Sequence, residues 1–300
     1  MTINASSQSG MRPRRSCLYM PGANERALEK AKSIPADSLL LDLEDAVAPD
    51  AKIEARDRVC AAVKAGGYDQ REVIIRINGL DTQWGMDDLN AAVAAGPDGI
   101  LAPKVSTSDE VLALDTALSQ AGAKPDFALW IMIETPLSIL NLKEIGMCAH
   151  STRLNTFVMG TNDLAKDMRA LMTPDRIAFQ AQLSMAVTAA RAFGITAIDG
   201  VYNDIKNEAG LQAECEQGRV LGFDGKTLIH PAQVEMCNTI FSPSEADITQ
   251  AKDVVQAFAD PANSGKGVLK VNGKMTELLH LVEAERIIAM DNVIKSQNQG

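Results

Sequence analysis

The sequence predicts an α/β fold, a closed (β/α)8 TIM barrel followed by a C-terminal helical extension. Eight short apolar segments alternate with amphipathic segments, at intervals of roughly 20 to 40 residues. Such alternation implies parallel strands joined by right-handed helical crossovers. Eight units within about 230 residues match the size of a closed barrel. An open doubly wound sheet is the alternative, but no GxGxxG motif follows the first strand.

Each predicted strand is a short apolar run bounded by turn residues, which is typical of strands buried on both faces. The clearest example is the run from Phe127 to Glu134. Pro136 follows it and ends the ladder, because proline has no backbone donor. The eight strands are expected at 16–20, 38–43, 72–78, 99–104, 127–134, 156–160, 196–201 and within 222–230.

The helices between these strands are predicted from capping residues and from apolar residues at helical spacing. Asn24 is a suitable cap for the first helix. Asp109 and Glu110 favour the start of another, because acidic residues suit a helix N-terminus. Helices are expected at 25–32, 51–65, 84–95, 106–121, 136–145, 174–193, 207–221, from 231 onward, at 244–259 and at 275–295.

The chain is expected to contain one barrel domain, residues 15–260. Residues 1–14 form a polar tail that lacks the apolar segment of a signal peptide, so we expect it to be disordered. Residues 261–300 are expected to form a hinge, with Gly265 and Gly267, and a helical lid. The lid helix carries Leu278, Leu281, Val282 and Ile288 on an apolar stripe that needs a surface to cover.

Composition narrows the range of partners. The net charge of −10 argues against nucleic acid or an anionic membrane. No apolar run approaches the roughly 20 residues that span a bilayer. The five cysteines are widely spaced and form no CxxC motif, which favours reduced thiols. We therefore expect a cytoplasmic protein that acts on small molecules.

Polar residues stand where the predicted strands end. In a (β/α)8 barrel the carboxyl ends of the strands form one rim, which holds the active site. Carboxylates dominate this set, and their repulsion is relieved by a hard cation such as Mg²⁺ or Mn²⁺. The rim residues expected are Glu44, Asp45, Arg76, Asn78, Lys104, Glu134, Asn162 and Asp163.

The rim residues have different expected roles. Glu134 and Asp163 are predicted metal ligands, and Glu44 and Asp45 are predicted to hold metal-bound water. Arg76 lies inside an apolar strand, where its guanidinium suits a substrate carboxylate or enolate oxygen. Structural alternatives stay open: a salt bridge for Glu134, a helix cap for Asp163, a solvated turn for Glu44 and Asp45, and a pair with Glu44 for Arg76.

These residues lie in motifs that resemble the citrate lyase β-subunit-like branch of the HpcH/HpaI aldolase superfamily. The resemblance covers nearly the whole chain, from Arg15 to about Ala289. The motifs are Arg15–Asn24, Leu41–Val47, Arg76–Asn78, Glu134–Pro136, Gly160–Asp163 and Gly225–Pro231.

The resemblance implies a (β/α)8 barrel in a homotrimer or a dimer of trimers, with Mg²⁺ and a CoA thioester substrate. It implies that Glu134 and Asp163 bind the metal and that Arg76 contacts the substrate. Arg15 and Lys30 would lie near CoA. Glu134 and Asn162 are also expected to contact the substrate.

One motif departs from the lyases of this branch, which often carry Asp after a Gly-x-Met-x sequence near the C-terminus. Here Gly273-Lys-Met-Thr is followed by Glu277. In this respect the chain looks like thioesterase-type members that act on malyl-CoA, which also have Glu there. The departure leaves the reaction open between lyase and thioesterase.

The lyase reaction is the main expectation. A 2-hydroxy-dicarboxylic acyl-CoA of the malyl-CoA type would undergo retro-Claisen C–C cleavage to a 2-oxo acid and an acyl-CoA. Arg76 would stabilise the developing oxyanion, and Glu277 of an adjacent subunit would protonate the enolate carbon.

The alternative is hydrolysis to malate and CoA, with Glu44 or Asp45 activating water. A covalent acyl-enzyme is not expected, because no Ser-His-Asp or Cys-His grouping is evident. A non-catalytic CoA-ester-binding subunit is a third possibility, but it predicts missing metal or oxyanion groups, and all of them are present in the sequence.

Overall fold

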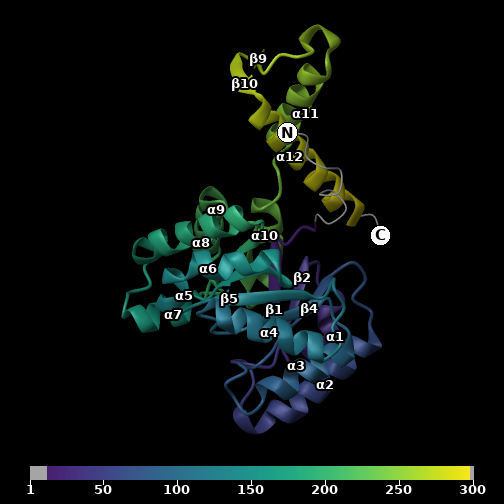
Figure 1. Ribbon diagram of the computed structural model, residues 1–300, viewed down its shortest axis with the longest axis vertical. Helices are drawn as coiled ribbons and strands as arrows, with labels where there is room; N and C mark the ends of the chain where they lie inside the picture. Colours follow the sequence, from purple (N-terminus) through teal and green to yellow (C-terminus); the bar gives the residue numbers. More distant parts are fainter. Residues whose placement is uncertain (1–11, 298–300) are drawn as a thin grey trace. The chain divides into compact units, whose positions relative to one another are not determined.

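The computed structural model describes residues 12–297, and they belong to two compact units (Figure 1). The first unit is Arg14–Phe241, and the second holds Arg12, Pro13 and the described residues from Ser242 onward. The sequence analysis expected the barrel domain to extend to residue 260. In the structure, helix α11 (Glu245–Ala259) belongs to the second unit and not to the barrel. Residues 1–11 of the expected tail lie outside the described part of the chain.

The first unit contains a closed barrel of eight parallel strands in sequence order, with β1 pairing to both β2 and β8. The predicted (β/α)8 fold and all eight predicted strands are therefore confirmed. The strands are β1 (Ser16–Pro21), β2 (Ser38–Asp42), β3 (Glu72–Arg76), β4 (Gly99–Ala102), β5 (Ala128–Ile133), β6 (Leu154–Met159), β7 (Thr196–Asp199) and β8 (Gly225–Leu228).

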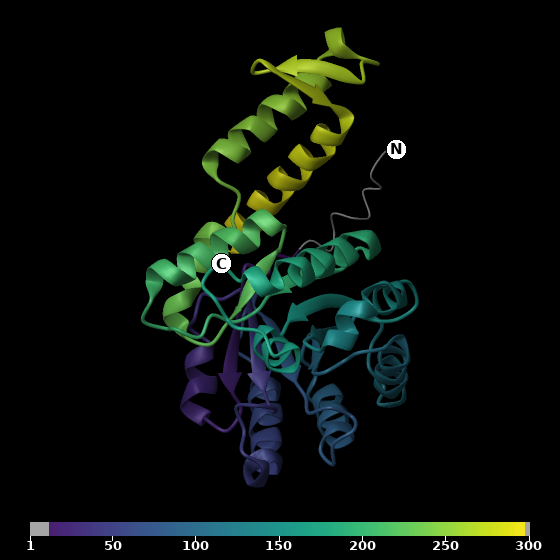
Figure 2. The same ribbon diagram turned by 90° about the vertical axis from the view of Figure 1, so that its left-hand side faces the viewer.

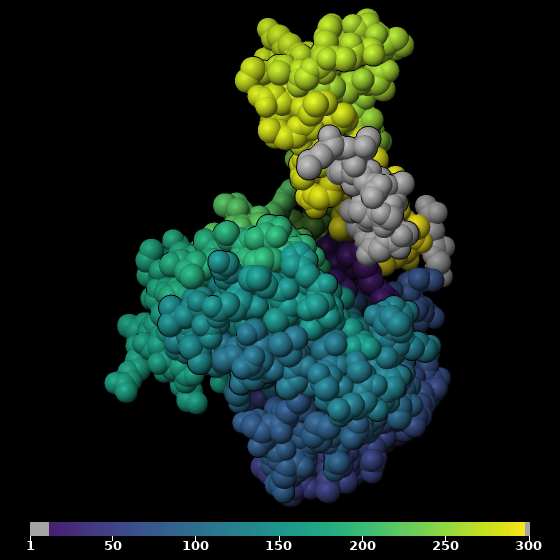
Figure 3. Space-filling view, viewed as in Figure 1, coloured from purple at the N-terminus to yellow at the C-terminus, as the bar shows by residue number. Residues whose placement is uncertain are grey.

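Helices follow the strands and surround them. In Figure 3 the blue to teal segments of this unit cover much of the face turned to the viewer. The helices are α1 (Glu25–Ala31), α2 (Lys52–Ala65), α3 (Gly85–Ala95), α4 (Ser108–Gln120), α5 (Pro136–Leu140), α6 (Leu142–Met147), α7 (Thr161–Met168), α8 (Gln180–Phe193), α9 (Glu208–Leu221) and α10 (Val234–Ile240).

Three helical predictions for this unit were wrong in detail. The helix expected at 136–145 is divided into α5 and α6. Helix α7 directly follows β6, where the sequence analysis expected no helix. Helix α8 begins at Gln180, although a start near residue 174 was expected. The physical reason is Arg176, whose φ of 50° is left-handed and interrupts a right-handed helix there.

The barrel interior is packed, as expected for a (β/α)8 fold. One apolar cluster fills the inside of the barrel, and a larger cluster lies between the strands and the helices. The interior cluster includes Cys17, Leu40, Ile74, Leu101, Trp130, Val158 and Ile198. The inside of the barrel is therefore apolar at this level. The polar side chains that follow the strands lie beyond it, at the rim.

A buried ionic cluster ties β7 and β8 to α9. Asp199 accepts hydrogen bonds from Arg176 Nη1 at 2.7 and 2.9 Å and from Lys226 Nζ at 3.2 Å. Lys226 also donates to Glu214 at 2.6 Å. Burial alone would raise the pKa of Asp199, but Lys226 and Arg176 hold it below its usual value. These charges compensate one another within the structure.

The second unit is built from α11, a two-stranded hairpin and α12 (Leu278–Gln297), and the two helices lie side by side in Figure 2. Ala251 and Val254 of α11 share a small core with Val271 and Ala284. Of residues 12–297, no stretch forms a helix long and apolar enough to cross a bilayer.

The start of the C-terminal helix also differs from the prediction. Residues 268–277 form antiparallel strands β9 (Val268–Val271) and β10 (Lys274–Glu277), so the helix begins at Leu278 instead of Met275. Asn272 and Gly273 both have positive φ, at 48° and 80°. An Asn-Gly pair is the preferred sequence for a tight hairpin turn, which explains the strands.

The expected apolar stripe of α12 divides between two environments. Leu281 and Ile288 pack against the small core of the second unit. Leu278 is 54% exposed and Val282 is 40% exposed, beside the exposed Leu279. The helix therefore covers its own unit with one part of the stripe and leaves the other part on the surface.

Candidate active site

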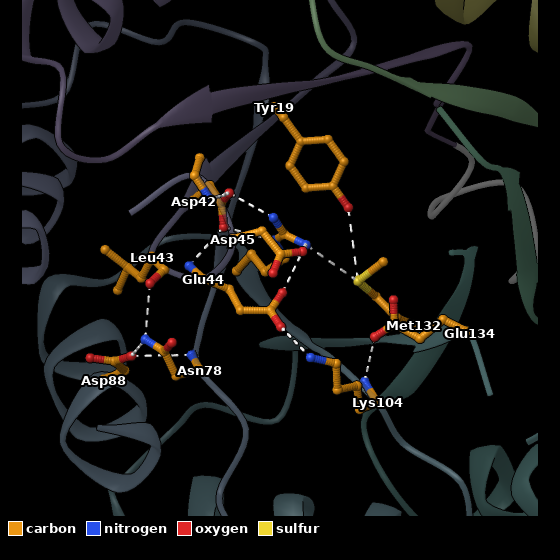
Figure 4. A network of polar contacts seen from close by, with 12 residues as sticks. Tyr19, Asp42, Leu43, Glu44, Asp45, Asn78, Asp88, Lys104, Met132 and Glu134 are labelled. Carbon is orange, nitrogen blue, oxygen red and sulfur yellow. Dashed lines mark hydrogen bonds and ion pairs between the residues drawn. The ribbon is translucent and has the colours of Figure 1, made fainter. Parts of the chain in front are cut away.

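Arg76 and Asp42 form the centre of the rim. They lie opposite each other on the paired strands β3 and β2. Arg76 Nε donates to Asp42 Oδ1 at 2.7 Å and Nη2 donates to Oδ2 at 2.6 Å (Figure 4). The ring of Tyr19 lies 4.7 Å from Arg76 Cζ. One edge of the buried guanidinium is thus held by Asp42 and one face lies against the Tyr19 ring, which fixes its orientation.

Asp42 was not predicted as a site residue. Besides holding Arg76, its carboxylate accepts the backbone N–H groups of Glu44 and Ala46, at 2.8 and 3.1 Å. It therefore orders the loop that follows β2. An aspartate within the apolar run Leu39–Leu43 was the available signal, but its pairing with Arg76 depends on strand register, which sequence alone does not specify.

The third nitrogen of Arg76, Nη1, faces two more carboxylates. It lies 2.8 Å from Glu44 Oε2 and 3.3 Å from Asp45 Oδ2. The structural alternative for Arg76, a pair with Glu44, is thus partly realised, although Asp42 is the bidentate partner. Burial raises the pKa of Glu44, while the charge of Arg76 opposes that shift. Asp45 is largely exposed.

Glu134 directly follows β5 and is 1% exposed. Its Oε1 accepts the backbone N–H of Lys104 at 2.7 Å. Burial and, next, the charge of Glu44 raise the pKa of Glu134 to about 8, and the charge of Asp163 adds to the shift. The carboxylate is therefore poorly compensated by the protein, and a nearby cation would stabilise its ionised form.

Asp163 lies half-buried in the first turn of α7, and this helix starts next to Gly160, whose backbone closely approaches the side chain of Glu134. The N-cap of α7 is Gly160, so Asp163 does not occupy the capping position of this helix. Asn162 is exposed and exchanges side-chain hydrogen bonds with Asn203, at 3.3 and 2.8 Å.

The pair Glu134 and Asp163 fits a hard divalent cation. Both offer only oxygen ligands, which Mg²⁺ prefers, and Mg²⁺ commonly takes one or two carboxylates and completes its shell with water. Within residues 12–297, no group of three or more His, Cys, Asp or Glu could hold a metal. A Cβ on Gly160 would lie 2.4 Å from Glu134 Oε2, so glycine leaves room beside that oxygen.

Other predicted site residues lie elsewhere. Arg15 immediately precedes β1, at the amino end of the barrel, where its Nε and Nη2 donate to Asp37 at 2.8 and 2.7 Å. The structure therefore does not bring Arg15 to the rim, because a residue before a parallel strand lies at the opposite end from one after it. Lys30 is exposed in the last turn of α1.

Two further residues have local structural contacts. Asn78 donates through Nδ2 to Leu43 O at 2.9 Å and to Asp88 Oδ2 at 2.6 Å, so it joins the loop after β2 to helix α3. Glu277 is the last residue of β10 in the second unit. Its backbone N–H donates to His280 Nδ1 at 2.9 Å.

Comparisons with known proteins agree with this arrangement. Residues 15–231 match the HpcH/HpaI aldolase/citrate lyase family. A (3S)-malyl-CoA thioesterase of Cereibacter sphaeroides is 50% identical over 282 residues, covering 94% of this chain and 96% of that protein. The citrate lyase subunit beta of Escherichia coli is 37% identical over 282 residues, covering 92% of each chain.

A solved structure has the same architecture. It is the CitE protein of Mycobacterium tuberculosis in complex with magnesium, acetoacetate and coenzyme A. The two chains share 26% sequence identity with a TM-score of 0.73, over 93% of this chain and 97% of that one. The barrel, its rim of carboxylates around an arginine, and these similarities together show that the chain belongs to the HpcH/HpaI aldolase/citrate lyase family.

Proposed function

We propose that this chain is a Mg²⁺-dependent thioesterase that hydrolyses a 2-hydroxy-dicarboxylic acyl-CoA of the malyl-CoA type to the free acid and CoA. The observation that carries this proposal is the 50% identity to (3S)-malyl-CoA thioesterases along nearly the whole chain. The similarity favours the hydrolase, the alternative in the sequence analysis, over the lyase that was the main expectation there.

The lyase is the second candidate. It is supported by the 37% identity to citrate lyase subunit beta and by a rim that contains the proposed metal ligand Glu134 and the oxyanion-stabilising Arg76. The CitE structure with magnesium and coenzyme A supports Mg²⁺ and a CoA ester as ligands for either reaction.

Glu134 and Asp163 would hold the metal, since they are the paired oxygen donors of the rim. When bound, Mg²⁺ supplies Lewis-acid polarisation of a substrate oxygen. The protein contributes a fixed positive charge, because Asp42 orients Arg76 so that Nη1 faces the site. That N–H is suited to stabilise the oxyanion that develops on the thioester carbonyl.

Glu44 is the residue we assign as the base. Burial raises its pKa, which brings it closer to the range in which a carboxylate accepts a proton efficiently near neutral pH. Glu44 would take a proton from water as the water oxygen bonds to the thioester carbonyl carbon. The C–S bond then breaks, and the proton passes to the departing CoA sulfur, which yields the acid and the free thiol.

We also infer a homotrimer in which Glu277 serves a neighbouring active site. This is supported by exposed apolar residues around Glu277, with Met275 70%, Leu278 54% and Leu279 62% exposed. A cluster of exposed apolar side chains is typical of a surface that binds another protein. In the lyase reaction Glu277 would protonate the enolate carbon, and in hydrolysis it would orient the substrate.

Product analysis separates the two reactions. The purified protein is incubated with malyl-CoA and Mg²⁺, and products are identified by liquid chromatography and mass spectrometry. Malate with free CoA is the expected outcome, whereas glyoxylate with acetyl-CoA would identify the lyase. A Glu134→Ala variant controls for spontaneous and contaminating hydrolysis. Absence of both product pairs with the wild-type protein would contradict the proposal.

A further inference from the structure

The rim carries more carboxylates than Arg76 alone can neutralise. An acyl group with a carboxylate must bind among several acidic side chains, so it needs a cation that is available to it. In the described part of the chain, three cations interact with the carboxylates of the rim. They are Arg76, Lys52 and Lys104.

Two of these cations already have buried partners. The fork of Arg76 is held by Asp42. Lys52 is buried, and its Nζ donates to the main-chain oxygens of Leu43 at 3.0 Å and Glu44 at 2.8 Å. Moving either group toward a ligand would leave buried polar atoms without partners, which is costly.

The ammonium of Lys104 is in a different situation. Its side chain is 57% exposed, and its Nζ lies 3.4 Å from Glu44 Oε1, a long contact for an ion pair (Figure 4). A lysine side chain has a flexible four-carbon stem. The ammonium can therefore leave Glu44 without losing a buried hydrogen bond. The residue also borders a proposed metal ligand, because its main-chain N–H contacts Glu134.

The main chain of Lys104, in contrast, is fixed to the rim. Its φ is 56°, a left-handed conformation that residues with side chains rarely adopt. Pro103 has no N–H, so the N–H of Lys104 is the first donor available beyond β4. This N–H donates to Glu134 Oε1 at 2.7 Å. Such conformations often accompany functional sites.

From this geometry we propose that Lys104 is a substrate-binding residue whose ammonium moves from Glu44 to the carboxylate of the bound acyl group. Its main chain holds Glu134 in place during this exchange. The proposal rests on the proposed function for the identity of the acyl group. The ligand chemistry it requires is a small carboxylate bound beside the Glu134–Asp163 pair.

Three substitutions separate the charge of Lys104 from its backbone. Lys104→Met removes the charge and keeps the N–H. Lys104→Gly removes the charge and also relaxes the positive φ. Lys104→Arg keeps a positive charge. Lys64→Met is the matched control, because Lys64 is an exposed lysine in the last turn of α2, at the other end of the barrel.

Steady-state kinetics with malyl-CoA and inhibition by malate give the first readout. Loss of a charged hydrogen bond predicts a roughly 10- to 100-fold rise in KM and in the inhibition constant for malate, for both Met and Gly variants. We expect kcat to change less. Lys104→Arg should retain most of the affinity, and Lys64→Met should match the wild type. Wild-type KM and malate inhibition in Lys104→Met and Lys104→Gly would overturn the proposal.

Calorimetric titrations without turnover give the second readout. Malate is titrated into protein saturated with Mg²⁺, and Mg²⁺ alone is titrated into metal-free protein. Lys104→Met should weaken malate binding and leave Mg²⁺ binding intact, since the N–H to Glu134 remains. An equal loss of Mg²⁺ affinity would overturn the proposal by placing the effect on the metal ligands.

The two readouts also separate this proposal from the proposed function. One outcome combines two observations: Lys104→Met binds malate more weakly than the wild type, and the wild type does not turn over malyl-CoA. This outcome supports the role of Lys104 and contradicts the proposed reaction. Malyl-CoA hydrolysis that is unchanged in Lys104→Met overturns the role of Lys104 and leaves the proposed reaction intact.

Discussion

Arg76 and Asp42 are joined by two parallel hydrogen bonds of 2.7 and 2.6 Å across neighbouring strands of the barrel. The geometry uses the planar fork of arginine, which a lysine ammonium does not possess. The third nitrogen of Arg76, Nη1, faces the site and lies 2.8 Å from Glu44 Oε2. The side chain at position 76 thus has to hydrogen-bond the buried Asp42 and, in the proposed reaction, stabilise the oxyanion at the same time.

Arg76→Lys should therefore lose most activity. A single ammonium would pair with Asp42 and have no second arm for the oxyanion, so we expect kcat/KM to fall about 100-fold or more. Steady-state kinetics with malyl-CoA measures the loss. Arg191→Lys is the control, because Arg191 forms an exposed pair with Asp224. Near-normal turnover in Arg76→Lys would show that Arg76 only braces the barrel.

The raised pKa of Glu134 predicts how the stability of the metal-free protein depends on pH. The folded-state pKa is about 8, against an ordinary value of 4.5. Between these values the folded protein binds a proton that the unfolded chain does not, so the free energy of unfolding falls as pH rises through this window. Glu134→Gln removes the effect while keeping an acceptor for the N–H of Lys104.

The variant should match the wild type near pH 4.5 and exceed it at pH 8 by on the order of 4 kcal/mol in unfolding free energy. Urea unfolding in the presence of a chelator at several pH values measures the difference. Glu235→Gln is the control, since Glu235 is exposed on α10. A difference between Glu134→Gln and wild type that stays constant with pH would contradict the prediction.

The fold was predictable because its signal is repeated. Each strand is a short apolar run between turn residues, and the eight runs agree with the eight strands of the barrel. The failures are local. Helix α7 follows Gly160 without a side-chain cap, so the usual start signal is absent. The hairpin at Asn272 and Gly273 was not expected, although that pair is a strong turn signal, and its second strand overlaps the expected start of the C-terminal helix at Met275.

The site was predictable in part for a similar reason. Residues at strand ends must share one rim, which places Glu44, Arg76 and Glu134 together without knowledge of register. Contacts within the rim depend on geometry that a sequence does not display. The pairing of Asp42 with Arg76 needs the register of two strands, and the role of Lys104 needs the φ of one residue.

The buried ionic cluster around Asp199 should contribute strongly to stability. Asp199→Asn leaves Arg176 and Lys226 buried with Glu214 as the remaining carboxylate. Removing one partner of a buried ion pair costs about 3–5 kcal/mol. Chemical denaturation should show this loss. Glu54→Gln, which breaks a helical pair with Arg58 on the surface of α2, should cost less than about 1 kcal/mol. Equal effects of the two substitutions would show that the cluster is not stabilised by its charges.

Subunit mixing tests whether the active site is shared between protomers. Glu134→Ala removes a proposed metal ligand on the barrel, and Glu277→Ala removes the proposed acid or orienting group on β10. Each variant alone should be inactive or nearly so. If Glu277 acts on a neighbouring barrel, a mixed oligomer contains sites built from one intact rim and one intact Glu277. Activity should then return when the variants are combined under conditions that allow subunit exchange.

The mixing experiment has a different outcome if the active site is not shared between protomers. If Glu277 serves its own chain, every subunit in the mixture lacks one essential group, and activity stays at the level of the separate variants. Exchange itself is verified by mass spectrometry of the mixed oligomers, with one variant isotopically labelled. A Glu283→Ala variant mixed with Glu134→Ala is the matched control, since Glu283 is exposed on α12 and pairs with Arg286 of the same helix. Because Glu283→Ala keeps Glu277, it should be active by itself, and its activity should fall in proportion to dilution with Glu134→Ala.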